Sequence, residues 1–571
     1  MPDETIVGYL VASAEERQGR AFCYRPDGSS TSHGDALARI AAIVEWLEVL
    51  EIGRGDPVPC YLDLADPIPG IHIMLACAAV RAVPVPLSPV FSSDYFMRAI
   101  VHRLGAKVVF TTRKHVGRLC GHGVRVLCFD ERTRDEGEVS TLGDDVSIPS
   151  DRAIECLTNR ATTLRADDIF MIQPTAGSTG TPKLVLRRHC AFTRYARFIG
   201  DELAAGSNGQ DRFLMVAALT HAFGLHMLTT CLRLGAAMAI PTSLDTAVSL
   251  DEVRILDPTI LPLVPRVQAA LHRQASRRAG QRPFGPSARI VCSAGGSADR
   301  QILETFARQG VEILEFYGSS EASVVAVTPR GAWRPPFAGR LVPDVDARVG
   351  SDGELLVKSP GVTDGYVDDD AATRCAFENG YYKTGDFGEI AADGFLRILG
   401  RKSDVFNTPE GSNIHPRRIE EMIELEPWVD QVVLVGDQRP YVAALIVLSP
   451  AFCPTSVRGL RTTPLDPAVH REVYREAAAA IAEINSGQER IEHVVRFALF
   501  GEKFEDDVYA IVGGCKVRRN RKALAEKYGR VIDLLYAQAD TGDATLVAKK
   551  TESSLLQKTN SRHELSWKEL Q

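Results

Sequence analysis

Short apolar runs alternate with longer amphipathic segments along most of the chain. Helical spacing is clear in residues 34–56, where Leu37, Ile40, Val44 and Leu47 fall on one face. Buried strands are predicted by four apolar runs, at residues 106–112, 124–130, 288–295 and 311–318. Because strands alternate with helices, the pattern predicts an α/β fold with substantial parallel sheet.

The pattern changes near residue 400. Residues 429–449 predict two strands joined by a short turn, and 493–500 predict a further strand. Between them we expect a helix with Asp466 as N-cap and Pro467 at its first position, closing near Gly487. We therefore expect a large N-terminal domain over residues 1–400 and a small α+β domain over residues 401–540. The Lys-, Ser- and Thr-rich residues 541–571 are expected to be a flexible tail.

Composition and charge exclude several classes. Apolar residues make up 45% and charged residues 24% of the 571, as in globular proteins. A net charge of −7 argues against a nucleic-acid or anionic-membrane partner. Twelve scattered Cys without a C-x-x-C pattern disfavour disulfide or zinc frameworks and favour the cytoplasm. The N-terminus has no signal-peptide pattern, and the longest apolar stretch stops at Arg81, so no integral membrane association is expected.

Residues 173–189, "QPTAGSTGTPKLVLRRH", concentrate glycine and hydroxyl side chains. Backbone N–H groups in such a loop can cradle phosphate oxygens. The nucleotide-triphosphatase pattern is not met, because Lys183 follows Pro182 and precedes Leu184. By itself the stretch is equally compatible with a flexible surface loop.

Four further motifs change this balance: "FYGSSEAS" (316–323), "GYYKTGDFGEI" (380–390), "LGRKSDVFNTPEGSNIHPRRIEE" (399–421) and "GGCKVRRNRKALAEKY" (513–528). In order and spacing they resemble the adenylate-forming superfamily of acyl-CoA synthetases, peptide-synthetase adenylation domains and luciferases. The resemblance covers residues 35–535, and its C-terminal part is most similar to the long-chain fatty acyl-CoA synthetase branch.

The resemblance implies a large N-terminal α/β domain of several subdomains and a small mobile C-terminal α+β domain. It also implies a reaction in which a carboxylate attacks the α-phosphate of ATP, giving an acyl-adenylate and pyrophosphate. A thiol, usually that of CoA, then takes the acyl group. ATP, Mg²⁺ and CoA are the expected cofactors and co-substrate.

The resemblance assigns roles on the nucleotide side. The phosphates are expected to contact Thr175, Ser178, Thr179, Gly180, Lys183 and Ser320. Glu321 is similar to the family's Mg²⁺ ligand, because a hard cation prefers carboxylate oxygen. Tyr317 is expected to stack on adenine beside Gly295, Gly296 and Ser297, although that glycine stretch is also typical of a turn after a strand.

Further roles fall on the sugar and on the reacting groups. Asp386 is similar to the ribose-hydroxyl acceptor, and Arg401 is expected to reach the same sugar. Lys516 matches the catalytic lysine that stabilises charge on the α-phosphate. It lies in a basic run with Arg519 and Arg521, so a solvated basic face is the alternative. His221 resembles the histidine at the mouth of the acyl pocket, with a structural histidine as the alternative.

The acid is expected to be apolar. Between Arg212 and Leu234 there is no acidic residue that could pair with the ammonium group of an amino acid. A fatty acid and a bulky or aromatic acid of specialised metabolism fit equally. An acyl-CoA synthetase is the leading hypothesis. The alternatives are an enzyme that passes acyl-AMP to a carrier protein or separate thiolating partner, and a catalytically silent nucleotide-binding scaffold. The oligomeric state is left open.

Three positions depart from the family pattern. Leu184 replaces the usual glycine of the phosphate-loop motif, and Ser403 replaces a charged residue at the hinge. In the loop expected to face the thiol, Gly411 is kept but is preceded by Pro409 and Glu410. Glycine lets a backbone approach a thiol closely, and Glu410 adds a negative charge near the anionic CoA.

The departures at Ser403 and at Pro409-Glu410, but not the one at Leu184, predict that thioester formation is slow relative to adenylation. The measurement is thioester formation from purified acyl-adenylate and CoA, compared with adenylate formation from ATP. A thioester that forms faster than the adenylate contradicts the prediction and supports the alternative, that the differences are neutral loop variations.

Removal of residues 545–571 is expected to leave both the melting temperature and the rate of adenylation unchanged. The reason is that this segment is rich in Lys, Ser and Thr and lies beyond the family resemblance, so few buried contacts are expected. Calorimetry and a pyrophosphate assay on the truncated chain check this. A large fall in either quantity would show that the tail packs on the body.

Overall fold

The structure is a computed structural model of the chain. It describes residues 4–12, 14–61, 66–87, 94–119, 123–128, 139–141, 148–175, 183–204, 209–243, 248–278, 282–296, 298–402, 405–407, 409, 413–424, 426–454, 463–505, 508–512 and 516–537. The chain divides into two compact units. The first comprises Met1–Thr384, Gly388–Ile398 and Val512–Lys516, and the second Gly385–Phe387, Leu399–Ile511 and Val517–Gln571. The domain limits given above stay predictions, and residues 541–571 lie outside the described residues.

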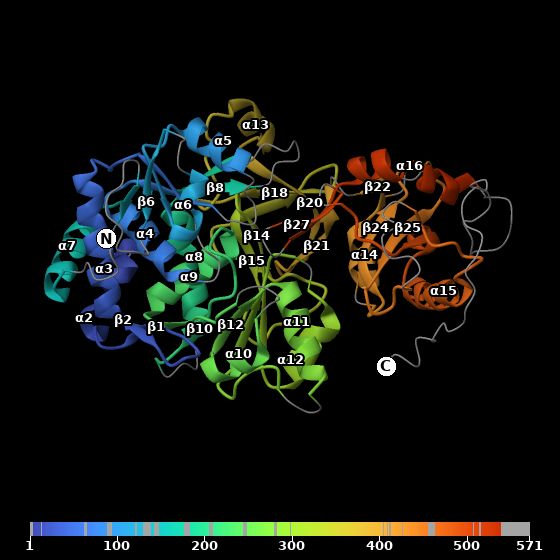
Figure 1. The fold of residues 1–571 in the computed structure, drawn as a ribbon, viewed down its shortest axis with the longest axis horizontal. Helices are drawn as coiled ribbons and strands as arrows, with labels where there is room; N and C mark the ends of the chain where they lie inside the picture. Colours follow the sequence, from blue (N-terminus) through green and yellow to red (C-terminus); the bar gives the residue numbers. More distant parts are fainter. Residues whose placement is uncertain are drawn as a thin grey trace. The chain divides into compact units, whose positions relative to one another are not determined.

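The first unit is an α/β structure (Figure 1). Its helices are α1 (Ile6–Ala12), α2 (Ala14–Arg17), α3 (His33–Val49), α4 (Ile68–Ala79), α5 (Asp94–Leu104), α6 (Arg113–Leu119), α7 (Ser150–Thr163), α8 (Cys190–Ala204), α9 (Ala222–Leu234), α10 (Leu250–Leu256), α11 (Pro265–Ser276), α12 (Arg300–Arg308) and α13 (Asp370–Ala376).

A nine-stranded sheet has the order β16-β15-β14-β13-β12-β10-β11-β1-β2. Its strands are β1 (Ala21–Tyr24), β2 (Ser30–Ser32), β10 (Arg212–Leu214), β11 (Ala237–Ala239), β12 (Ile260–Leu263), β13 (Ile290–Ser293), β14 (Glu312–Ser319), β15 (Ser323–Val327) and β16 (Arg340–Leu341). In this order, all neighbouring strands from β14 to β1 are parallel. Strand β2 pairs antiparallel with β1, β15 with β14, and β16 with β15.

Two smaller sheets contribute to the first unit, and two strands of the second of these sheets also include residues of the second unit. A parallel sheet of order β4-β3-β5-β6-β7 is built from β3 (Pro57–Tyr61), β4 (Val83–Leu87), β5 (Val108–Thr111), β6 (Arg125–Cys128) and β7 (Val139–Thr141). Another has the order β17-β18-β20-β19, with β21 on β20, and is built from β17 (Asp346–Val349), β18 (Glu354–Lys358), β19 (Phe377–Glu378), β20 (Tyr381–Ile390) and β21 (Leu396–Arg401). The hairpin of β8 (Ile169–Thr175) and β9 (Lys183–Arg188) stands apart.

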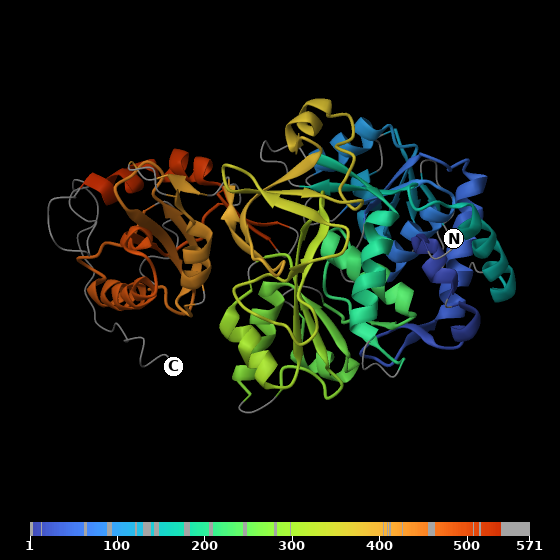
Figure 2. The same cartoon turned by 180° about the vertical axis from the view of Figure 1, so that it is seen from behind.

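Both faces of the nine-stranded sheet are buried, because successive strand residues point to opposite sides. Ile290 and Cys292 of β13 belong to the core shared with α8 and α9, whereas Val291 belongs to the core shared with α10, α11 and α12. Helices α8 and α9 lie side by side (Figure 1, Figure 2). The sheet is therefore held between two helical layers.

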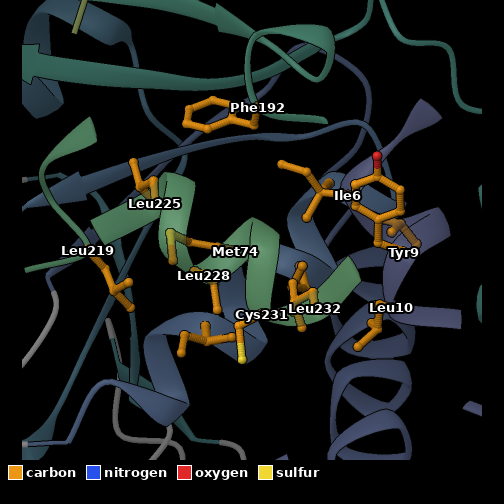
Figure 3. Packing of buried hydrophobic residues seen from close by; sticks show 14 of the residues in the cluster. Ile6, Tyr9, Leu10, Met74, Phe192, Leu219, Leu225, Leu228, Cys231 and Leu232 are labelled. Carbon is orange, nitrogen blue, oxygen red and sulfur yellow. The ribbon is translucent and has the colours of Figure 1, made fainter. Parts of the chain in front are cut away.

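Helix α9 packs on one side against α1, α4 and α8. Figure 3 shows its Leu225, Leu228, Cys231 and Leu232 turned toward side chains of these three helices, and all four are almost fully buried. The helix ends at Gly235, whose φ of 55° is left-handed, as is common just after a helix. This apolar packing fixes the helix that begins beside His221.

The predicted helix and strands of the first unit are confirmed. Helix α3 begins one residue before the expected region. It opens with a capping box, in which Ser32 accepts from the backbone N–H of Asp35 and the Asp35 carboxylate accepts from that of Ser32. Strands β5, β6 and β13 lie within three of the predicted apolar runs, and β14 extends one residue beyond the fourth.

The second unit has a three-stranded sheet of order β24-β25-β26, antiparallel and then parallel. Val432 and Leu434 of β24 pack in the core with α14 and α15, and Val433 packs in the core with α16. The described elements are β22 (Phe406–Asn407), β23 (Asn413–Ile414), α14 (Pro416–Glu424), β24 (Val429–Val435), β25 (Val442–Leu448), α15 (Arg471–Ser486), η5 (Arg490–Glu492), β26 (Val494–Phe500) and α16 (Arg521–Ala537), with a paired β27 (Tyr509–Val512) and β28 (Lys516–Arg519). The strands predicted at 429–449 and 493–500 are confirmed.

The predicted start of α15 is wrong. The Asp466 side chain accepts from the backbone N–H of Ala468, and its carbonyl accepts from those of Val469 and His470, which closes a separate turn. Helix α15 then begins at Arg471 with His470 as its N-cap, and it ends at Gly487 as expected. An Asp-Pro pair satisfies a turn as readily as a helix start, so the local signal did not separate the two.

Candidate functional site

The β8–β9 hairpin carries both ends of the glycine-rich loop. Thr175 pairs with Lys183 in the register, and the Thr175 hydroxyl donates to the Lys183 carbonyl at 3.4 Å. Leu184, at the position where glycine is usual, is fully buried among side chains of the β4-β3-β5-β6-β7 sheet, which accounts for an apolar residue there. Ser178, Thr179 and Gly180 lie outside the described residues.

A tight corner between β14 and β15 carries Ser320 and Glu321. A Cβ added to Gly318 would lie 2.0 Å from the backbone oxygen of Ser323, so only glycine fits there. Ser323 itself has a φ of 63°, an uncommon conformation for a non-glycine residue. Its buried hydroxyl donates to the Ala191 carbonyl at 2.6 Å, and this contact supports the strained backbone.

Contacts from the hairpin region hold this corner. Arg187 of β9 donates through Nη1 to the Ser320 carbonyl. The Thr363 backbone N–H donates to the Glu321 carbonyl at 2.7 Å, and the Thr363 hydroxyl donates to the Leu186 carbonyl, also at 2.7 Å. The phosphate-loop hairpin and the corner are therefore one connected structure.

Arg187 is unusual for an arginine because it is almost fully buried, with 1% of its surface exposed. Burial lowers the pKa of its guanidinium to about 10, while the charges of Tyr195 and Glu321 act in the opposite direction. Its Nε and Nη2 have no hydrogen-bond partner. A buried cation is thus placed beneath the turn that carries the expected magnesium ligand.

The Glu321 carboxylate fits a magnesium ion. Oε1 accepts a hydrogen bond from the Tyr366 hydroxyl at 3.2 Å, and among the described residues no cation forms an ion pair with this carboxylate. Magnesium is often bound by one or two carboxylates together with nucleotide phosphates, so a single free carboxylate is sufficient from the protein side.

The residues expected around adenine end two neighbouring parallel strands. Gly295 and Gly296 follow β13, and Tyr317 lies in β14, which pairs with β13. Gly295 has a φ of 88°, which a side-chain-bearing residue rarely adopts. Ser297 lies outside the described residues. Residues from separate sequence motifs therefore share one edge of the sheet.

Asp386 and Arg401, both expected at the ribose, form an ion pair with each other. Arg401 Nε lies 3.0 Å from Asp386 Oδ1, and the Asp386 carboxylate is largely buried. Arg401 is therefore held by a carboxylate in this structure. A guanidinium donor and a carboxylate acceptor held together in this way can present one polar surface to a pair of sugar hydroxyls.

Lys516 is the first residue of β28, and its side chain lies outside the described part of the structure, as do Ser403, Glu410 and Gly411. The other end of β28 is anchored in the second unit. Arg519 donates to Glu424 Oε1 at 2.6 Å and lies 3.2 Å from Glu420 Oε2. The Tyr509 hydroxyl donates to Glu424 at 2.6 Å.

This buried ionic cluster corrects one interpretation of the basic run. The Arg519 side chain is 5% exposed and that of Glu420 is 1% exposed, and Arg521 also pairs with Glu420. A solvated basic face is therefore wrong for Arg519, although Lys522 is exposed. The pattern of basic residues alone gave no signal that two carboxylates of α14 would meet them.

His221 is the N-cap of α9 and is partly exposed. Gln173 in β8, which the sequence did not single out, is fully buried and donates through Nε2 to the Thr220 carbonyl at 3.0 Å. This bond ties the strand before the glycine-rich loop to the residue before His221. His226, one turn further along α9, contacts the Ser323 hydroxyl at 3.0 Å, and burial lowers its pKa well below the usual value.

Within the described part of the chain, no helix combines the length and the apolar character that crossing a bilayer requires.

Comparison with known families agrees with this geometry. The sequence profile described as "AMP-binding enzyme" matches residues 10–367, and the profile described as "AMP-binding enzyme C-terminal domain" matches residues 403–540. The chain belongs to the AMP-binding enzyme family, and the family resemblance found in the motifs is confirmed.

Two curated relatives illustrate the range of similarity. The long-chain-fatty-acid–CoA ligase FadD15 of Mycobacterium bovis is 32% identical over 279 residues, which are 48% of this chain and 46% of that protein. The 2-succinylbenzoate–CoA ligase of Geobacillus kaustophilus is 28% identical over 364 residues, 60% of this chain and 72% of that protein. The matched region spans about half the length of the first of these relatives.

Solved structures share the fold. The anthranilate CoA ligase AuaEII in complex with anthranoyl-AMP has a TM-score of 0.72 at 17% identity, covering 93% of this chain and 98% of that one. The O-succinylbenzoate coenzyme A synthetase MenE from Bacillus subtilis, in complex with AMP, has a TM-score of 0.68 at 19% identity, covering 90% and 97%. The expected fold, an α/β N-terminal part with a smaller C-terminal part, is confirmed.

Proposed function

We propose that the chain is an AMP-forming acyl-CoA synthetase. It activates an apolar carboxylic acid with ATP to an acyl-adenylate and then transfers the acyl group to CoA. The observation that carries the proposal is the joining of the β8–β9 hairpin to the β14–β15 corner, because it brings Lys183 and Glu321 against one aromatic side chain, that of Tyr366. The names of the relatives, which are CoA ligases, support the same reaction.

Each proposed residue has one task. Pyrophosphate leaves with concentrated negative charge, which the glycine-rich loop, Lys183 and Ser320 bind. Glu321 would hold Mg²⁺, which would supply positive charge to the phosphates. Tyr317 and the glycines after β13 bind adenine, Asp386 and Arg401 bind ribose, and Lys516 stabilises the charge of the in-line displacement. His221 lies at the entrance for the acid.

The substrate is proposed to be a fatty or aromatic acid. Helix α9 and its N-cap provide no carboxylate for an amino acid's ammonium group, and Leu225, Leu228 and Leu232 of α9 form an apolar surface toward its neighbours. CoA is the proposed acceptor, and a carrier protein or separate thiolating partner is the alternative. The cytoplasm is the proposed compartment, from the scattered cysteines.

Pyrophosphate release measured across a panel of fatty, aromatic and amino acids, with and without CoA, tests the proposal. We expect release that depends on an apolar acid, acyl-AMP detectable by mass spectrometry, and a thioester when CoA is present. Acyl-AMP formation without a thioester would identify another acceptor. ATP binding without pyrophosphate release from any acid would favour the silent scaffold.

A further inference from the structure

Tyr366 lies between two residues with opposite charges. The Lys183 ammonium lies over its ring, with Nζ 4.6 Å from the ring centroid. The hydroxyl of the same side chain donates to Glu321 Oε1 at 3.2 Å. A cation over an aromatic face and a phenol bound to a carboxylate are both attractive contacts. One side chain therefore contacts the lysine at the base of the phosphate loop and the carboxylate of the corner.

The position of Tyr366 is itself fixed. Its side chain is 6% exposed, and its backbone forms an antiparallel bridge with Val185 of β9. Its backbone N–H donates to the Thr373 hydroxyl at 3.0 Å. The residue can act as a rigid spacer.

An ammonium and a carboxylate that contact the same side chain attract each other in a partly buried site. No direct ion pair between Lys183 and Glu321 occurs in the described structure. A direct ion pair would neutralise both groups. It would have to break before Lys183 could bind a phosphate or Glu321 could bind a metal ion. Instead, the Tyr366 ring contacts the Lys183 ammonium and the Tyr366 hydroxyl contacts the Glu321 carboxylate. Each of these contacts is weaker than a direct ion pair between the two charges.

We propose that Tyr366 is a positioning residue that holds Lys183 and Glu321 apart, leaving the lysine available to nucleotide phosphates and the carboxylate available to magnesium. This inference rests on the proposed function, because it takes the two charged residues to be part of a nucleotide and metal site. It assigns to Tyr366 two separable contacts, one through its ring and one through its hydroxyl.

Two substitutions separate these contacts. Tyr366→Phe keeps the ring beneath Lys183 and removes the hydroxyl from Glu321, whereas Tyr366→Leu removes both. The measurement is the dissociation constant of ATP by calorimetry, without acid, once in EDTA and once in excess Mg²⁺. For Tyr366→Phe we expect unchanged ATP affinity in EDTA. The increase in ATP affinity caused by Mg²⁺ is expected to be about tenfold smaller than in the wild-type chain, as for a lost hydrogen bond to a charged group. For Tyr366→Leu we expect an additional, about fivefold weaker affinity in EDTA, from the lost cation–π contact.

Tyr24→Phe is the matched control. The Tyr24 hydroxyl donates to the Leu256 carbonyl at 2.6 Å, so its removal also deletes one largely buried hydrogen bond, away from Lys183 and Glu321. We expect wild-type ATP affinity with and without Mg²⁺. Tyr366→Phe folds with the same shape, so its result stands even if Tyr366→Leu does not fold.

The two proposals fail differently. If the wild-type chain binds ATP more tightly with Mg²⁺ and Tyr366→Phe keeps the full gain, Tyr366 is not a positioning residue, while the proposed function stands. Equal losses for Tyr366→Phe in EDTA and in Mg²⁺ would likewise overturn the inference, since a general structural defect weakens both. If wild-type chain shows no ATP binding under either condition, the proposed function itself is wrong.

Discussion

Replacement of Lys516 by alanine is expected to reduce the rate of acyl-adenylate formation at least about a hundredfold, while ATP affinity stays within about twofold. The reason is that a preorganised donor aimed at charge that develops in the transition state is worth on the order of 3 kcal/mol or more. Because that charge develops only during the displacement, ground-state binding of ATP changes little. Single-turnover formation of acyl-AMP and calorimetric ATP binding measure the two quantities separately.

Lys522→Ala is the matched control for this experiment. Lys522 belongs to the same basic run, but it lies exposed in α16. The Lys522→Ala substitution removes one positive charge close to Lys516 in the sequence, so we expect acyl-adenylate to form at the wild-type rate. Adenylate formation at the wild-type rate in Lys516→Ala, or an equal loss in both variants, would show that Lys516 is not the catalytic lysine.

Glu420→Gln is expected to cost the second unit about 3–5 kcal/mol of its free energy of unfolding, as is typical when one partner of a buried ion pair is removed. Glu420 faces both Arg519 and Arg521, and its Oε1 also accepts from the Leu434 backbone N–H at 2.9 Å. An amide can keep the last contact, but it leaves the buried Arg519 charge with less compensation. Native-state hydrogen exchange of the full-length chain, resolved to peptides of β24 and α14, measures the loss.

The exposed pair Arg439–Asp533 provides a comparison within the same unit. Its side chains are 42% and 70% exposed, so Arg439→Gln is expected to cost less than about 1 kcal/mol. Losses of similar size in the two variants would mean that the buried cluster contributes no more than a surface pair. In that case the anchoring of β28 by Arg519 would have to be abandoned.

The sequence predicts helices and strands correctly where one hydrophobic pattern extends through the whole element. The helix over α3 has both an apolar face and a capping box, and the strands β13 and β14 are continuous apolar runs because both of their faces are covered. The start of α15 was missed because Asp466 closes a turn whose residues are the same ones that favour a helix N-terminus. Local preference cannot decide between two structures that use the same hydrogen-bonding groups.

The candidate site was predictable only as far as its motifs extend. Lys183 and Glu321 lie in the family motifs described above. Tyr366, which contacts both, comes 183 residues after Lys183 and lies outside those motifs. Arg187 lies within the glycine-rich motif but is identified only by its burial. Arg519 was grouped with solvated charges because its carboxylate partners come from α14, about a hundred residues earlier. Such contacts depend on tertiary packing, which spacing along the chain does not encode.

The tight corner between β14 and β15 sets a limit on how this enzyme can be re-engineered. Any side chain at Gly318 would collide with backbone, and Ser323 combines a left-handed conformation with a buried hydroxyl, so few residues can replace either. A mutagenesis library that aims at a new acid should leave residues 318–323 constant. The partly exposed Ala222 at the start of α9 is a better position to randomise, since it belongs to neither the corner nor the buried part of the helix. The preference for an acid could then be diversified while the proposed nucleotide and metal site stays unchanged.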